Sequence, residues 1–252
     1  MSSSKLRNRR GSTTVPAALV LVTGTGTGVG KTVVTWSLAR RAKERGVAVT
    51  ALKPLCSGGR GDARILHQAG PAELGIDDVN PWHFRAALAP LLAARREGRT
   101  VTLSKVLAYL NAARGRGGWV LVEGAGGLRS PLGEDFDALN LVERLKAVPV
   151  VVGVNRLGVL NDLVLSVEAL PGPLRKRAVI VVSGGKGHQS LVARTNLEWL
   201  RQRFGPDRVI AIPWIPDWPR AVERPLSRRV ATAADAVWSA LGLSGTRRGA
   251  RN

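Results

Sequence analysis

Residues 21–33, LVTGTGTGVGKTV, carry the strongest structural signal in the sequence. The stretch leaves an apolar run, passes through several glycines and ends in Gly-Lys-Thr. Glycines let the backbone turn inward so that successive N–H groups point at an anion, and a helix that starts at the lysine adds the positive end of its dipole. A Gly-Lys-Thr ending after a strand is typical of a loop that binds nucleotide phosphates. The spacing is unusual, however, because Thr25 stands where G-x-x-x-x-G-K-[ST] requires glycine.

The same stretch excludes a dinucleotide-binding loop. The pattern G-x-G-x-x-G counted from Gly24 places Val29 in the last glycine position, and counted from Gly26 it places Lys31 there. A triphosphate loop instead needs a lysine that pairs with the β- and γ-phosphates and a hydroxyl that completes a Mg²⁺ shell. Lys31 and Thr32 meet that need, so the stretch predicts a site for a nucleoside triphosphate.

Apolar runs and helix-like stretches alternate along the rest of the chain. Near-continuous Val, Leu and Ile runs are typical of parallel strands buried on both faces. Strand–helix alternation with short glycine-containing joins predicts a doubly wound, mostly parallel α/β sheet flanked by helices, of the P-loop NTPase type. The expected strands are 18–23, 47–53, 119–123, 148–154, 178–182 and 208–212, and the expected helices are 31–45, 86–96, 104–114, 160–170, 194–204 and 231–241.

Composition sets the expected domain organisation and location. We expect one domain over residues 17–243, between disordered basic tails at residues 1–16 and 244–252. The chain has one cysteine, no apolar run of the roughly 18–20 residues that span a bilayer, and no apolar centre of a secretion signal near its start, so we expect a cytoplasmic protein. The net charge of +20 attracts polyanions. No basic motif interleaved with aromatics accompanies it, so we expect no specific nucleic-acid partner.

Two acidic residues extend the predicted phosphate site. Glu123 ends the apolar run WVLVE and is followed by Gly124-Ala125-Gly126-Gly127, and ligands of open α/β sheets bind beyond the carboxyl ends of the strands. Asp62 precedes a helix in GGRGDARIL and taken alone would be read as its N-cap. Together with Thr32, these carboxylates predict a Mg²⁺ site of oxygen ligands.

The ordered motifs resemble those of the dethiobiotin synthetases, and that family's phosphate loop also has five residues between its first glycine and Gly-Lys-Thr. Any one motif would be weak evidence, but together they extend from residue 22 to residue 214. They are VTGTGTGVGKT (22–32), KPLCSG (53–58), Asp62, NPWHF (80–84), VEGAGG (122–127), VNRLGVLN (154–161) and IPW (212–214).

The resemblance implies an ATP-dependent cyclo-ligase of biotin synthesis that uses Mg²⁺. An amine of 7,8-diaminononanoate would take up CO₂ as a carbamate, whose oxygen attacks the γ-phosphate of ATP and gives a carbamic–phosphoric anhydride. The second amine would then close the ureido ring and expel phosphate. The family works as a homodimer with the substrate site at the subunit interface.

The resemblance also assigns roles to individual residues. Lys53 matches the family's active-site lysine and would act with Lys31 and Thr27, and fixed cations of this kind stabilise charge that grows in a transition state. Ser57 would bind the substrate. The neighbouring subunit's turn would bind its carboxylate through Gly158, Val159, Leu160 and Asn161. The nucleotide would be held by Gly28, Val29, Gly30, Lys31, Thr32, Val33, Asp62, Glu123, Gly124, Ala125, Gly126, Ser183, Gly184, Pro213, Trp214 and Ile215, and the metal by Thr32, Asp62 and Glu123.

On the residues alone, a plain strand–helix turn stays open as an alternative for the Gly158 segment. Cys56 is predicted to be a small buried apolar residue with no base nearby in sequence to activate it. Three positions depart from the family pattern. Asp162 stands where many members have histidine, Leu91 follows Pro90 where histidine is usual, and Ser183 replaces an asparagine that reads the adenine edge. Serine cannot present both an amide donor and an acceptor, so the sequence predicts relaxed nucleotide choice.

Two other functions stay open at the level of sequence. A partitioning-type ATPase that acts on DNA or a membrane would make use of the basic charge. Such proteins carry a signature lysine early in the phosphate loop, where this chain has Gly26, and they do not explain KPLCSG. A relative that binds nucleotide but has lost activity is disfavoured because Lys31, Lys53 and the three metal-ligand candidates are all present.

Overall fold

A parallel sheet forms the centre of the protein in the computed structural model, which describes residues 18–185 and 190–242. Every described pairing in this sheet is parallel, and the strand order is β2-β5-β1-β6-β7-β8. The doubly wound α/β fold predicted from the sequence is confirmed. The strands are β1 (Leu19–Gly24), β2 (Val49–Leu52), β5 (Trp119–Glu123), β6 (Val148–Val154), β7 (Val179–Ser183) and β8 (Val209–Ile212).

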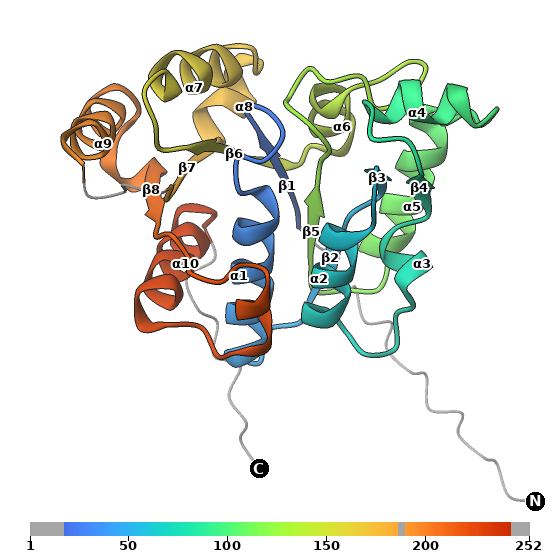
Figure 1. Ribbon diagram of the computed structural model, residues 1–252, viewed down its shortest axis with the longest axis horizontal. Coiled ribbons are helices and arrows are strands. Elements are labelled where there is room, and N and C mark those ends of the chain that lie inside the picture. The colour runs from blue at the N-terminus through green and yellow to red at the C-terminus, as the bar shows by residue number, and fades with distance from the viewer. Residues whose placement is uncertain (1–17, 186–189, 243–252) are drawn as a thin grey trace, which may run out of the picture.

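Helices cover both faces of the sheet, because side chains alternate across each strand and both sets are apolar. Val20 and Val22 of β1 belong to the core on one side, and Leu19 and Leu21 belong to the core on the other. Figure 1 shows α1 in front of the sheet between α10 and α2. The first face carries α1 (Lys31–Glu44), α2 (Gly61–Ala69) and α10 (Arg228–Ala240), and the second carries α5 (Leu103–Arg114), α6 (Ala138–Leu145), α7 (Val159–Glu168) and α9 (Leu191–Phe204).

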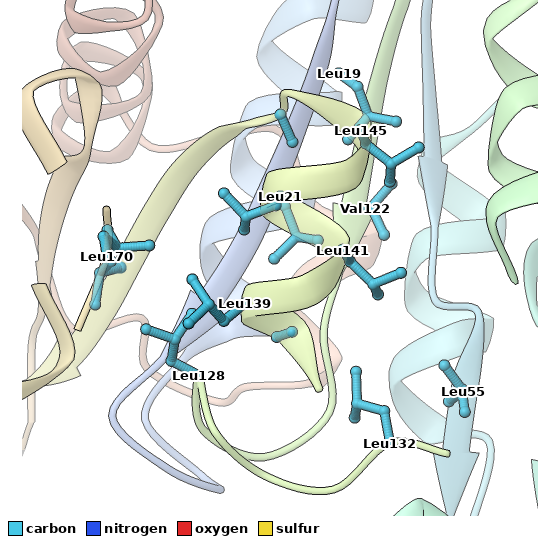
Figure 2. Packing of buried hydrophobic residues seen from close by; sticks show 14 of the residues in the cluster. Leu19, Leu21, Leu55, Val122, Leu128, Leu132, Leu139, Leu141, Leu145 and Leu170 are labelled. Atoms are coloured by element: carbon cyan, nitrogen blue, oxygen red, sulfur yellow. The ribbon is translucent and has the colours of Figure 1, made fainter. Parts of the chain in front are cut away.

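Helix α6 was missed by the sequence reading. Its start is marked by Asp137, whose carboxylate accepts from the Asn140 backbone N–H at 3.1 Å while the Asn140 side chain accepts from the Asp137 N–H at 2.9 Å. This reciprocal cap is a recognisable start signal. Figure 2 shows Leu141 and Leu145 of α6 beside Leu21, Leu19 and Val122 of the sheet. The helix forms because it caps itself and buries a leucine face.

A second, two-stranded parallel sheet joins β3 (Leu55–Ser57) to β4 (Trp82–Phe84). It was also missed, because three-residue strands leave almost no periodic signal. The expected helix 86–96 begins only at Pro90, since proline favours the first helical position and holds Ala89 in an extended conformation. The short helices are α3 (Ile76–Val79), α4 (Pro90–Arg96) and α8 (Gly172–Arg177), with 3₁₀ turns at Pro206–Arg208 and Arg220–Glu223.

The two predicted tails, residues 1–16 and 244–252, lie wholly outside the described residues. Within the described ranges, the helices are all too short or too polar to cross a membrane.

Candidate functional site

The phosphate loop joins the end of β1 to the start of α1 at the carboxyl edge of the sheet. Gly28 and Gly30 have φ angles of 74° and 96°, a left-handed conformation that other residues adopt only with strain. At Gly30 a side chain would also meet Ser183, because an added Cβ would lie 2.9 Å from the Ser183 Cβ. The loop therefore needs glycine for its turn and for its close approach to β7.

Lys31 folds back over the loop that it closes. Its Nζ donates to the Gly26 carbonyl at 2.6 Å, and the residue is only 6% exposed. Burial, together with the nearby charge of Lys53, lowers the pKa of Lys31 to about 8. The ammonium group is thus held beside the loop although burial removes part of its hydration. An anion bound in the loop would compensate for that loss by electrostatic attraction.

Four side chains from different parts of the sequence meet beside the loop. Lys53 follows β2 and donates through Nζ to Glu123 Oε1 at 2.6 Å and to the Gly124 carbonyl at 2.8 Å. Thr32 donates through its hydroxyl to the same Glu123 Oε1 at 2.9 Å. Asp62, in the first turn of α2, lies 3.6 Å from the Lys53 ammonium. Since Arg60 is the N-cap of α2, Asp62 does not serve as its cap.

The Lys53–Glu123 pair is almost fully buried. Burial acts against both charges and raises the pKa of Glu123. Burial alone would lower the pKa of Lys53, but the carboxylates of Glu123 and Asp62 outweigh it and raise that pKa overall. The lysine therefore carries a full positive charge at neutral pH and lines the cavity that the phosphate loop also lines.

The donor set around Glu123 fits a Mg²⁺ ion. Glu123 Oε2 is buried and has no hydrogen-bond partner, although an orphaned carboxylate oxygen is costly in a protein interior. The described residues form no cluster of three or more His, Cys, Asp or Glu side chains that could hold a metal alone. A Mg²⁺ ion commonly takes one or two carboxylates and completes its shell with phosphates and water.

A cavity of about 770 Å³ opens above these groups. Strand order divides its wall, because Lys53 and Glu123 come from the β2–β5 side and Ser183 and Pro213 come from the β7–β8 side. The predicted site residues that line it are Thr27, Gly28, Gly30, Lys31, Thr32, Val33, Lys53, Ser57, Asp62, Glu123, Ala125, Gly126, Ser183, Gly184, Pro213, Trp214 and Ile215.

Two of the residues predicted to bind the nucleotide, Val29 and Gly124, do not line the cavity. The Val29 carbonyl accepts from Ser183, and the Gly124 carbonyl accepts from Lys53. The sequence reading missed Ala87, Leu88, Ala89 and Trp218, which also line the cavity. Pro90 was a sequence signal for this loop. Because proline favours the first position of a helix, it predicts that the residues just before it lie in a loop and not in the expected helix 86–96.

The turn at Gly158 lies away from this cavity. Gly158 has φ 93° and precedes α7, but residues 158–161 are absent from the cavity wall of the same chain. Asp162, one of the departures noted in the sequence, pairs with Arg156 at 3.0 Å. The structure therefore brings the Lys53 group together with the phosphate loop but leaves the predicted carboxylate turn apart from it.

Cys56 lines the cavity and is 4% exposed. Burial raises the pKa of its thiol to about 11, which lowers the reactive thiolate fraction at neutral pH roughly a hundredfold relative to an ordinary cysteine. We expect iodoacetamide to label the folded protein at pH 8 at least about a hundredfold more slowly than the protein in urea. Labelling followed by mass spectrometry measures both rates, and equal rates would contradict the neutral, buried thiol.

Comparison with solved structures shows the same fold in other proteins. The chain is similar to the MinC:MinD cell division protein complex of Aquifex aeolicus, with a TM-score of 0.60 and 13% identity over 88% of this chain and 96% of that chain. It is also similar to a putative plasmid partition protein of Borrelia burgdorferi bound to AMPPNP, with a TM-score of 0.58 and 11% identity over 90% and 98% of the two chains. At such identities the likeness concerns the fold alone.

Sequence comparison is more specific. The family described as AAA domain matches residues 19–221. The ATP-dependent dethiobiotin synthetase BioD of Bacillus subtilis is 33% identical over 189 residues, which cover 73% of this chain and 82% of the relative. The protein of the same name from Anaeromyxobacter sp. (strain K) is 35% identical over 205 residues, covering 80% and 92%. With its phosphate loop, its buried Lys53–Glu123 pair and this identity over most of both lengths, the chain belongs to the ATP-dependent dethiobiotin synthetase family.

Proposed function

We propose that this protein makes dethiobiotin from 7,8-diaminononanoate, CO₂ and ATP, as a cyclo-ligase of biotin biosynthesis. The observation that carries the proposal is the convergence of Lys53, Thr32 and Glu123 beneath a phosphate loop. This arrangement supplies fixed charge but no acid–base dyad, and the proposed reaction needs charge stabilisation above all. Family membership supports the same activity.

In the proposed reaction Lys31 and Lys53 stabilise negative charge on different groups. The loop amides and Lys31 hold the β- and γ-phosphates. Lys53 neutralises the substrate carbamate and the transferring phosphoryl group, since it lines the same cavity as the phosphate loop and its ammonium is held by Glu123 and Asp62. Thr27 and Ser57 line the cavity and offer hydroxyls to the γ-phosphate or the carbamate.

Thr32, Asp62 and Glu123 would hold Mg²⁺, with Glu123 contributing its unpartnered Oε2. A bound Mg²⁺ supplies charge that bridges the phosphate oxygens and shields them from an anionic nucleophile. In the free protein the Glu123 carboxylate is held in place by Thr32 and Lys53, so this ligand is oriented before the ion arrives.

The carboxylate of diaminononanoate would be bound by the turn at Gly158 of a second copy of this chain. Exposed leucines support such a dimer. Leu88 and Leu92 beside the cavity are 45% and 49% exposed, and Leu157 and Leu165 beside the turn are 81% and 62% exposed. Figure 1 shows α4 and α7 both at the top of the view, on the right and on the left, so a partner that covers both sets of leucines would bring its turn toward the cavity. An interface buries such side chains.

The domain and its location complete the proposal. We assign the activity to residues 17–243 as one P-loop domain, and we place the protein in the cytoplasm, where ATP is abundant and a single free cysteine is stable.

Product analysis tests the activity directly. With ATP, Mg²⁺, diaminononanoate and bicarbonate, we expect dethiobiotin and one equivalent of ADP, detected by mass spectrometry and a coupled assay. Omission of either diaminononanoate or bicarbonate should abolish the product. ATP turnover that is stimulated by DNA and yields no dethiobiotin would instead favour a partitioning-type ATPase.

Mixing two inactive variants tests the shared site. Lys53→Ala removes the cavity cation, and Leu160→Asp places a negative charge in the turn that would receive a carboxylate. If each site combines one chain's cavity with its partner's turn, unfolding and refolding an equal mixture restores about a quarter of wild-type activity, because half of the dimers are mixed and each has one intact site. A mixture that stays inactive would show that cavity and turn act within a single chain.

A further inference from the structure

The wall of the cavity opposite Lys53 is apolar and aromatic. It is built where β6, β7 and β8 end, so a nucleotide whose phosphates lie in the loop would place its base against it. Ser183 stands among these residues as a side chain with hydrogen-bonding capacity. The residues that line this part of the wall are Val154, Ser183, Gly184, Pro213, Trp214, Ile215 and Trp218.

Ser183 directs its proton away from the cavity. Its hydroxyl donates to the Val29 carbonyl of the phosphate loop at 2.7 Å, and the residue is 5% exposed. A hydroxyl has one proton, so it retains only acceptor capacity toward a ligand. The β7 end and the loop are also in steric contact, since Gly30 has no room for a side chain beside Ser183. The hydroxyl thus joins the last residue of β7 to the loop that cradles the phosphates.

The backbone donor that directly follows Ser183 is committed as well. The Gly184 N–H donates to the Ile212 carbonyl at 2.7 Å, and Pro213 has no N–H. An added Cβ at Gly184 would lie 2.3 Å from the Trp214 nitrogen, so the two segments are in direct contact here and leave no space for a polar side chain. Along this part of the wall, the described side chains thus offer no paired donor and acceptor to a base edge.

An aromatic side chain remains at the mouth of this wall. Trp214 lines the cavity and is 42% exposed, and Trp218 packs edge-on against Trp36 at 5.3 Å between ring centroids. Stacking on an aromatic ring tolerates any base, because every base has a π face. Discrimination that rests on shape and stacking is much weaker than discrimination by paired hydrogen bonds.

We propose that Ser183 is a positioning residue of the phosphate loop rather than a reader of the base, and that the base subsite accepts purine and pyrimidine triphosphates alike. This proposal takes one thing from the proposed function, namely that the protein uses a nucleoside triphosphate as co-substrate. Binding measurements therefore test it separately, because they require no dethiobiotin formation.

The first experiment measures Mg²⁺-dependent binding of ATP, GTP, CTP and UTP by tryptophan fluorescence, with inorganic tripolyphosphate as a competitor that has no base. We expect the four dissociation constants to agree within about tenfold. Tripolyphosphate should displace each of them. An ATP preference of a thousandfold would overturn the tolerant base subsite.

The second experiment separates the two roles of Ser183. Ser183→Ala and Ser183→Cys remove the strong donor, and Ser183→Thr keeps a hydroxyl. We expect Ala and Cys to weaken all four nucleotides and tripolyphosphate by the same factor, roughly fivefold for one hydrogen bond, and Thr to restore binding. Ser104→Ala, an exposed serine on α5, should change nothing.

The outcomes are distinct. If Ser183 reads the base, Ser183→Ala leaves tripolyphosphate binding unchanged and spreads the four nucleotide constants apart, which would overturn the proposal. A common loss that Ser183→Thr does not rescue would likewise overturn it, because the hydroxyl would then not be the cause. If nucleotides bind as expected while no dethiobiotin forms, the proposed function fails and the role of Ser183 stands.

Discussion

Lys53→Ala is expected to lower the turnover of dethiobiotin synthesis by ~10²-fold or more, the scale of losing a main electrostatic contact in a transition state. Lys53 is 4% exposed and its ammonium is fixed by Glu123 at 2.6 Å, so the charge is oriented before substrate binds. Nucleotide affinity should change much less than turnover, because Lys31 and the loop amides hold the phosphates. Steady-state kinetics combined with nucleotide titration separates the two effects.

The same substitution leaves Glu123 buried without its partner. Removing one member of a buried ion pair costs about 3–5 kcal/mol of stability, so the variant's thermal unfolding must be measured beside its activity. Lys53→Gln keeps a hydrogen-bond donor without the charge and should be as inactive while more stable. Lys105→Ala, an exposed lysine on α5, is the matched control. Wild-type turnover in a folded Lys53→Ala protein would show that KPLCSG does not form the active site.

Lys31→Ala is expected to impair nucleotide binding and turnover together, in contrast to Lys53→Ala. Its ammonium lies over the loop, 2.6 Å from the Gly26 carbonyl, and is 6% exposed. A charge-assisted contact to a phosphate contributes about 1.5–3 kcal/mol, so affinity for ATP should fall by roughly 10–100-fold. Because burial lowers the pKa of this lysine to about 8, its free charge is partly lost above that pH and nucleotide binding there should take up a proton.

Lys43→Ala on the same helix is the control, since Lys43 is exposed at the far end of α1. Titration calorimetry at pH 8.5, in two buffers with different ionisation enthalpies, measures the proton uptake. The uptake should be present in the wild type and in Lys43→Ala and reduced in Lys31→Ala. Unchanged ATP affinity in the folded Lys31→Ala protein would contradict the role given to the loop.

Local sequence determined the strands of the central sheet, most of its long helices and the phosphate loop. The Val-rich runs of β1, β5 and β6 can be buried on both faces only in a parallel sheet, and Gly28 and Gly30 permit the backbone that Lys31 closes. These signals lie within a few residues of one another, so they could be read directly. The self-capped helix α6 was equally local, with Asp137 and a leucine face, and it was missed although its signal was present.

Only the tertiary structure decided which distant groups touch. Lys53 meets Glu123 because β2 pairs with β5, although 70 residues separate the two side chains, and the family resemblance had suggested their roles without their contact. Ser183 reaches the Val29 carbonyl across 154 residues, and the role that we propose for this residue rests on that contact. Such contacts depend on strand order and on how closely β7 approaches the loop. The order of the strands and the distance between β7 and the loop result from packing of the whole chain. The conformational preference of a single residue does not determine either of them.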